Sequence, residues 1–152
     1  MAKINVLMVC LGNICRSPLA EGILKHKAPS GEVFVDSAGT SNYHIGELPD
    51  QRSVATARKY GIDITDQRGR QFKTSDFDAF DLIYAMDQSN YQHLVAMAPD
   101  EASRQKVHLI LDEVYPGERM DVPDPYYGGD MGFDNVFKML DQACDRILEK
   151  IL

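Results

Sequence analysis

A cysteine and an arginine lie close together near the start of this chain, in the segment CLGNICRSP over residues 10–18. A cysteine attacks phosphorus as its thiolate, and an arginine can bind two oxygens of one phosphate at once. Gly12 and Asn13 tolerate positive φ, so the chain can turn tightly here and direct backbone N–H groups toward an anion. The pattern predicts a phosphate-binding loop with Cys10 as nucleophile and Arg16 as clamp. The alternative is that Cys10 is a small buried apolar residue.

The elements around this loop would position it. Residues 1–9 are almost continuously apolar, which is typical of a parallel strand buried on both faces. The thiol would then lie at the carboxyl end of the strand, where open α/β sheets bind ligands. Pro18 favours an extended Ser17, which predicts Ser17 as N-cap of a helix over residues 18–27. The positive end of that helix would favour the Cys10 thiolate. The Ser17 hydroxyl has a second possible role beside the helix cap, which is to donate a hydrogen bond to this thiolate.

Strand and helix patterns alternate along the rest of the chain. Further strands are predicted at residues 32–36, 82–86 and 107–111. One helix, capped by Asp50, is predicted to run to Tyr60, another to start at Asp87 or Ser89, and the last to span residues 133–151. Residues 72–80 hold a further short segment. Strands separated by helices pair in parallel through right-handed crossovers. We therefore predict an α/β fold, a flavodoxin-like three-layer sandwich with a four-stranded parallel sheet, formed by one domain over residues 1–152.

Composition limits the partners and the compartment. The chain has 152 residues and a formal net charge of −7, which argues against a nucleic-acid surface. It has no apolar run near the length of a membrane span, and its apolar start is too short for a secretory signal. Three cysteines without paired zinc spacing favour a reducing compartment. We expect a cytoplasmic monomer that needs no metal or other cofactor and binds neither nucleic acid nor membrane.

A long segment without periodicity, over residues 111–133, offers acids for proton transfer. The leaving oxygen of a phosphate ester departs more easily with a proton, so a general acid is needed. The candidates are Glu118, Asp121, Asp124 and Asp130. Flanking prolines would stiffen the backbone of Asp124. The residue pattern alone does not choose among the four, and each could be a solvated surface carboxylate.

The segment VCLGNICRSP over residues 9–18 resembles the active-site loop of the low-molecular-weight protein tyrosine phosphatases. The segments DSAG at 36–39 and DPYY at 124–127 resemble further motifs of that family, in the same order. The resemblance extends over essentially the whole chain. It implies the flavodoxin-like fold and hydrolysis of phosphotyrosine monoesters through a cysteinyl-phosphate intermediate, without a metal.

The resemblance also implies roles for individual residues. Cys10 would be the nucleophile, Arg16 would bind the phosphate, and Asp124 would act first as acid and then as base. The remaining residues of the phosphate loop are Leu11, Gly12, Asn13, Ile14, Cys15 and Ser17, and the residues at the rim of the pocket are Tyr43, His44 and Tyr127. In the family the second cysteine of the loop is a redox partner of the nucleophile, and the adjacent tyrosines, here Tyr126 and Tyr127, are phosphorylated in some relatives.

The expected substrates are phosphotyrosine proteins, among them a tyrosine kinase, or small aryl phosphates. Arsenate reduction is the nearest alternative function on this fold. In the related family it needs two further cysteines after the third strand, and residues 86–100 contain none. A phosphocysteine carrier of a sugar-transport system would need neither Asp124 nor an arginine at this spacing. An inert phosphate-binding module would bind phosphate without turnover.

Overall fold

Four parallel strands form the centre of the structure, a computed structural model that describes residues 4–125 and 132–152. β1 (Ile4–Cys10) lies between β2 (Val33–Gly39) and β3 (Leu82–Ala85), and β4 (Val107–Leu109) pairs with β3, giving the order β2-β1-β3-β4. After β1 the chain adds β2 at one edge of β1, and it later adds β3 at the opposite edge. The carboxyl end of β1 is therefore the switch point at which such sheets bind ligands.

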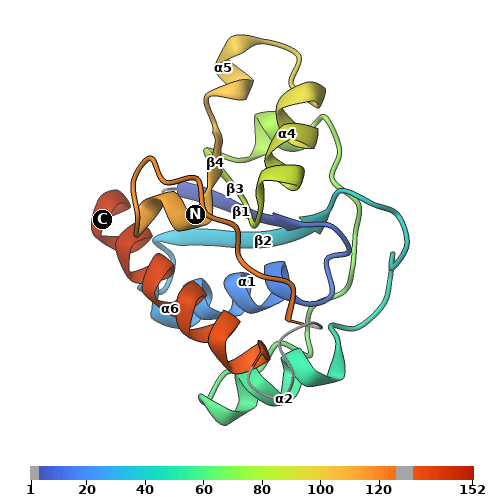
Figure 1. Cartoon of the computed structure of the whole chain (residues 1–152), viewed down its shortest axis with the longest axis vertical. Coiled ribbons are helices and arrows are strands. Elements are labelled where there is room, and N and C mark those ends of the chain that lie inside the picture. The colour runs from blue at the N-terminus through green and yellow to red at the C-terminus, as the bar shows by residue number, and fades with distance from the viewer. Residues whose placement is uncertain (1–3, 126–131) are drawn as a thin grey trace.

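Helices cover both faces of this sheet (Figure 1). On one face lie α1 (Arg16–Lys27), α2 (Gln51–Lys59) and α6 (Gly132–Ile151). On the other lie α3 (Asp76–Ala79) and α4 (Gln88–Met97), and the short α5 (Glu101–Arg104) follows α4. A 3-10 turn, η1 (Ile110–Glu113), comes directly after β4. This is the predicted three-layer α/β fold.

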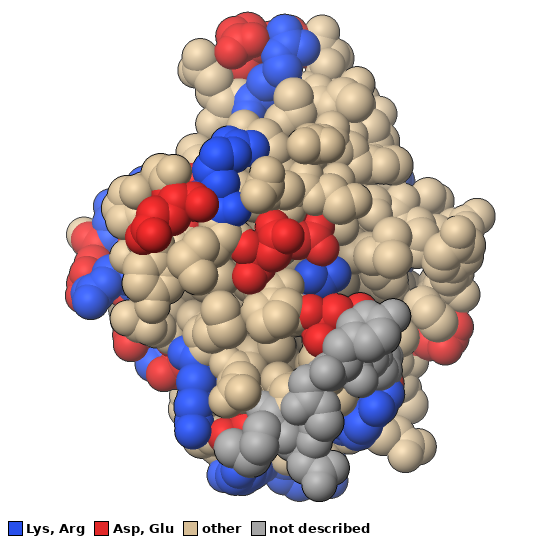
Figure 2. Space-filling model, in the orientation of Figure 1, with Lys and Arg blue, Asp and Glu red and all other residues tan. Residues whose placement is uncertain are grey.

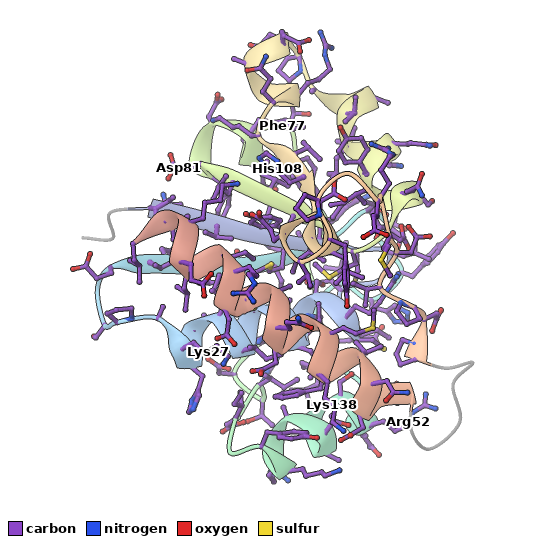
Figure 3. The ribbon with its side chains drawn as sticks, turned by 60° about the vertical axis from the view of Figure 1, so that its left-hand side comes forward. Lys27, Arg52, Phe77, Asp81, His108 and Lys138 are labelled. Atoms are coloured by element: carbon purple, nitrogen blue, oxygen red, sulfur yellow. The ribbon has the colours of Figure 1, made fainter. Side chains whose placement is uncertain are left out.

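Two apolar clusters, one on each face of the sheet, form the core. Alternate residues of β1 belong to opposite clusters: Met8 packs with α1 and α6, and Leu7 with Phe77 and Leu94. This explains why β1 is apolar at nearly every position. Phe77 and Lys27 lie on opposite sides of the sheet (Figure 3). The apolar stripe predicted for the last helix is confirmed, and its buried members are Val136, Leu140, Ala143, Cys144 and Ile147.

The prediction that Ser17 caps the first helix is wrong. α1 begins at Arg16, and Cys15 occupies the N-cap position without a side-chain cap hydrogen bond. Ser17 lies inside the helix and is fully buried, with its hydroxyl turned to Cys10. Pro18 is then the third helical residue, where the N–H has no intrahelical partner, so proline fits there without loss.

Other boundaries differ from the predictions by a few residues, and strand pairing explains two of these differences. The fourth strand ends at Leu109, whose partner Ala85 is the last residue of β3, so residues 110–113 have no strand to pair with. The second strand continues to Gly39, because it pairs with β1 as far as Cys10. In the described part of the chain, no helix combines the length and apolarity that a membrane span needs.

Candidate active site

A cavity of about 360 Å³ opens at the carboxyl end of β1. Three separate stretches of chain line it: the loop after β1, the loop after β2, and the segment before α6. The lining residues are Cys10, Leu11, Gly12, Ile14, Cys15, Arg16, His44, Asp124 and Pro125. The proposed nucleophile, clamp and acid are thus brought to one cavity, although more than a hundred positions separate the first from the last.

The loop after β1 wraps around the sulfur of Cys10. The Asn13 backbone N–H points at Cys10 Sγ, at 3.3 Å, and Asn13 has a φ of 57°. The chain directly after β2 holds this loop through hydrogen bonds from the N–H groups of residues 40 and 41 to the carbonyls of Cys10 and Leu11. Gly39 permits that approach, since an added Cβ would lie 2.8 Å from the Leu11 carbonyl oxygen.

Asn13 organises the polar groups behind the loop. Its Oδ1 accepts from the Arg70 backbone N–H at 3.0 Å. Its Nδ2 donates to Ser17 Oγ at 2.8 Å and to Ser37 Oγ at 2.9 Å. Each hydroxyl therefore has its own proton available for another partner. Ser17 Oγ lies 3.0 Å from Cys10 Sγ, so its proton is available to the sulfur.

The second hydroxyl of this network leads to a buried carboxylate on α1. Ser37 donates to Glu21 Oε1 at 2.6 Å, and Lys25 pairs with the other oxygen of Glu21. Burial raises the pKa of Glu21, against the opposing effect of its hydrogen bonds from Lys25 and Ser37. The network thus runs from the nucleophile through Asn13 to a charged pair on the helix.

Arg16 is fixed along one edge of its guanidinium. Nη1 donates to Asp87 Oδ2 and to the Val122 carbonyl oxygen, both at 2.9 Å. Within the described residues both partners use Nη1, which leaves the N–H groups of Nε and Nη2 for an anion. A planar fork of that kind matches two oxygens of a phosphate.

The segment that carries the candidate acids is anchored just before the cavity. The Val122 N–H donates to the Met86 carbonyl at 2.8 Å, and Asp121 Oδ1 accepts from the Gln88 N–H at 2.8 Å. Asp124 then lies on the cavity wall with Pro125. Asp121 and Glu118 are not among the lining residues of the described chain, and Asp130 lies outside the described residues.

The described residues predicted for the rim lie in different settings. His44 lines the cavity, and its Nδ1 lies 3.0 Å from Glu47 Oε2. Tyr43 does not line the cavity and is 74% exposed, because the chain directs it outward into solvent. Tyr126 and Tyr127 lie outside the described residues. Asn13 and Ser17 also stand behind the cavity rather than on its wall, so their contacts are with the loop and the sulfur.

Comparison with known proteins agrees with this geometry. The sequence model of the family described as "Low molecular weight phosphotyrosine protein phosphatase" matches residues 5–152. The chain belongs to this family. The Saccharomyces cerevisiae low molecular weight phosphotyrosine protein phosphatase is 40% identical over 99% of this chain and 96% of its own.

Solved structures of other phosphatases show the same architecture. A protein tyrosine phosphatase from Entamoeba histolytica superposes with a TM-score of 0.89 at 38% identity, covering 97% of this chain and 96% of the other. YfkJ from Bacillus subtilis gives a TM-score of 0.88 at 39% identity, covering 97% and 94%. The predicted family, fold and enzyme class are confirmed: this is a protein-tyrosine-phosphatase, a hydrolase.

Cys15 and Cys144 occupy different environments in this phosphatase. Cys15 is buried on the cavity wall, in the same loop as Cys10. Cys144 lies in the core between α6 and α1, and burial raises the pKa of its thiol. The packing role predicted for Cys144 is confirmed, and the redox role of Cys15 stays a prediction.

Sequence reasoning missed four residues that support the phosphatase loop: Glu21, Ser37, Arg70 and Asp87. Asp87 directly follows β3, at the same edge of the sheet as Cys10, so the predicted topology contained a signal for it. Ser37 belongs to the DSAG segment that the family resemblance singled out, without an indication of its partner. No sequence pattern pointed to the backbone contact of Arg70.

Proposed function

We propose that this phosphatase hydrolyses phosphotyrosine monoesters by attack of the Cys10 thiolate on phosphorus. The observation that carries the proposal is the setting of Cys10 Sγ, which has the Ser17 hydroxyl at 3.0 Å and the Asn13 N–H at 3.3 Å. Both groups can donate to a charged sulfur, and α1 begins beside it, so its positive end faces the loop. In the first step the S–P bond forms and the bond to the phenolic oxygen breaks.

Asp124 would move the proton in both steps. It protonates the departing phenolic oxygen, and the resulting carboxylate then takes a proton from the water that attacks the cysteinyl-phosphate. The S–P bond breaks, phosphate leaves, and the thiolate is restored. The position of Asp124 on the cavity wall supports this role.

Arg16 and the loop would stabilise the transferring phosphoryl group. Phosphoryl transfer depends mainly on positioning and on charge stabilisation of the equatorial oxygens. Arg16 supplies two donors from the edge that Asp87 and Val122 leave unused. The backbone N–H groups of the loop would bind the remaining oxygen, as in other anion-binding turns.

The substrates that we propose are phosphotyrosine proteins, among them a tyrosine kinase, or small aryl phosphates. Acidic and basic side chains are interspersed on the face shown in Figure 2, which supports recognition by local geometry rather than by bulk charge. We propose that the enzyme acts as a monomer with a single catalytic domain. A nucleophilic thiol favours the reducing cytoplasm as its compartment.

Rapid-quench turnover of p-nitrophenyl phosphate tests the mechanism. We expect a burst of one nitrophenol per enzyme and, with labelled substrate, a phosphoenzyme that forms on Cys10. Cys10→Ser should bind phosphate but show no burst and no turnover. Turnover by Cys10→Ser, or label on another residue, would contradict the proposal. Arsenite formation from arsenate and a thiol donor would favour the alternative redox function.

A further inference from the structure

We propose that a groove next to the anion cavity binds an apolar side chain of the substrate polypeptide that flanks the phosphotyrosine. The inference rests on the proposed function and extends it, since it assigns a subsite for the protein part of the substrate. The groove has a volume of about 600 Å³ and lies between the phosphate loop, the loop after β2 and α2.

The groove lies beside the cavity that holds the nucleophile. Ile14 lines both of them. Ile14 and a pair of interacting side chains form the divide between the two hollows. In this pair His44 lines the cavity, Glu47 lines the groove, and His44 Nδ1 lies 3.0 Å from Glu47 Oε2. Because only this divide separates the groove from the cavity, a side chain that flanks a phosphotyrosine bound at Cys10 can reach the groove by crossing it.

Backbone hydrogen bonds shape the groove before any substrate binds. The Asp50 N–H donates to the Ile14 carbonyl at 2.7 Å, which ties the start of α2 to the phosphate loop. Gly46 N–H donates to the Gly69 carbonyl at 2.7 Å, and Gly69 N–H donates to the Glu47 carbonyl at 2.8 Å. A preformed site lowers the ordering cost of binding.

The lining selects an apolar occupant. Ile14, Leu48, Val54 and Ala55 form its apolar walls, and Leu48 is 52% exposed. Charged side chains, including Glu47 and Arg58, are also part of the lining. An apolar side chain would cover the walls while the polar peptide backbone stays within reach of the charged groups.

Apolar exposure is concentrated around this part of the molecule. Nine large apolar or aromatic side chains are exposed among the described residues, and four of them belong to the two loops that border the cavity and groove: Leu11, Tyr43, Ile45 and Leu48. Large exposed apolar patches on a protein surface mark interaction sites. This surface and the groove together form a docking face beside the proposed reacting phosphate.

A series of phosphotyrosine peptides tests the subsite. Each peptide carries alanine at all positions within three residues of the phosphotyrosine, and in each member one alanine is replaced by leucine. In the wild-type enzyme we expect leucine at one position to raise kcat/KM about tenfold, the order of magnitude that one buried apolar side chain contributes to binding. Hydrolysis of p-nitrophenyl phosphate, which has no polypeptide, reports the chemistry separately.

Ala55→Glu should abolish the preference for leucine by placing a charge on the wall of the groove. Ala102→Glu is the matched control, because Ala102 is an exposed helical residue of α5, far from the groove, and this variant should keep the preference. If Ala55→Glu fails to fold by circular dichroism, Leu48→Ser in the exposed loop makes the same test.

The outcomes separate this inference from the proposed function. Phosphotyrosine hydrolysis without any leucine preference, or a preference that survives both groove variants, overturns the subsite while the proposed function stands. Absence of phosphotyrosine hydrolysis by the wild-type enzyme overturns both. If light scattering shows that Ala55→Glu dissociates a dimer while the peptide preference is unchanged, the groove is an interface between copies, and the subsite is overturned.

Discussion

The orientation of one amide, that of Asn13, determines the direction of the hydrogen bonds behind the nucleophile. The Arg70 backbone N–H can only donate, so the atom that faces it is Oδ1 of Asn13. Nδ2 must then donate to the hydroxyls of Ser17 and Ser37. The proton of Ser17 is left for Cys10 and that of Ser37 for Glu21. Each side chain in the chain of contacts has a fixed role as donor or acceptor.

Removal of the Ser17 hydroxyl should slow the second chemical step. The sulfur of Cys10 becomes a leaving group when water attacks the cysteinyl-phosphate, and Ser17 is its side-chain donor at 3.0 Å. A hydrogen bond to a charged group contributes about 1.5–3 kcal/mol, so we expect Ser17→Ala to slow dephosphorylation about 10–100-fold. Rapid-quench kinetics should show an accumulated phosphoenzyme. The control is Ser37→Ala, one contact farther from sulfur, which should have a smaller effect.

Asp124→Asn should make the rate depend on the leaving group. A positioned general acid contributes about 10²–10⁴ in rate when the departing oxygen needs a proton. We expect a loss of this size in kcat/KM for phenyl phosphate and a much smaller loss for p-nitrophenyl phosphate, whose phenolate is stable. Equal losses for both substrates would assign proton donation to another residue.

At the scale of the elements, hydrophobic periodicity predicted the sheet and the longer helices correctly. Asp50 caps α2, as predicted, and Asp87, one of the two predicted starts, caps α4. The errors arose where a tertiary contact opposed a local rule. Ser17 satisfies the sequence pattern of an N-cap, but its hydroxyl is used by Cys10 and Asn13 instead. The short α5 has only an aspartate cap and too few residues for a periodic pattern.

The candidate site was predictable where its residues are contiguous. Cys10 and Arg16 lie in one loop, and their types and spacing define the chemistry. The partner Asp87 lies 71 positions from Arg16, and Val122 lies 106 positions from it. Such pairings depend on strand order and on how the segment before α6 packs, and no local pattern encodes them.

Asp134 joins α2 to the start of α6 and should give the stability of this contact a pH dependence. Hydrogen bonds from Lys59, Tyr60 and Lys138 hold the pKa of Asp134 well below its ordinary value. A lowered pKa in the folded state means that the ionised carboxylate stabilises the fold above the unfolded pKa, about 3.9, and that this stabilisation is lost as the pH falls below that value.

Asp134→Asn should therefore lower the urea midpoint of unfolding at pH 7, and the difference from the wild-type enzyme should narrow at pH values below about 4. Asp66→Asn, at an exposed aspartate, is the control and should leave the midpoint unchanged. A difference that is constant from pH 7 to pH 3 would show that Asp134 acts through packing rather than through its charge.

At the scale of the whole molecule, anion binding should stabilise the fold, because the cavity joins segments from both halves of the chain. A ligand at one hundred times its dissociation constant stabilises the native state by about 2.7 kcal/mol, which corresponds to an increase in Tm of about 5–10 °C for a chain of this size. Calorimetry with vanadate or phosphate measures this shift. Arg16→Ala should remove most of it, and an unchanged shift in that variant would locate anion binding elsewhere.

The long-range contact between Arg16 and the Val122 carbonyl has a consequence for biosynthesis. The reactive thiol is synthesised before its clamp can be held in place, because the carbonyl that binds the clamp lies more than a hundred residues later in the chain. α1, which follows the thiol, packs against α6, which is made later still. The thiol therefore emerges from the ribosome before these later segments, and its clamp can be fixed only after they have been made and have docked.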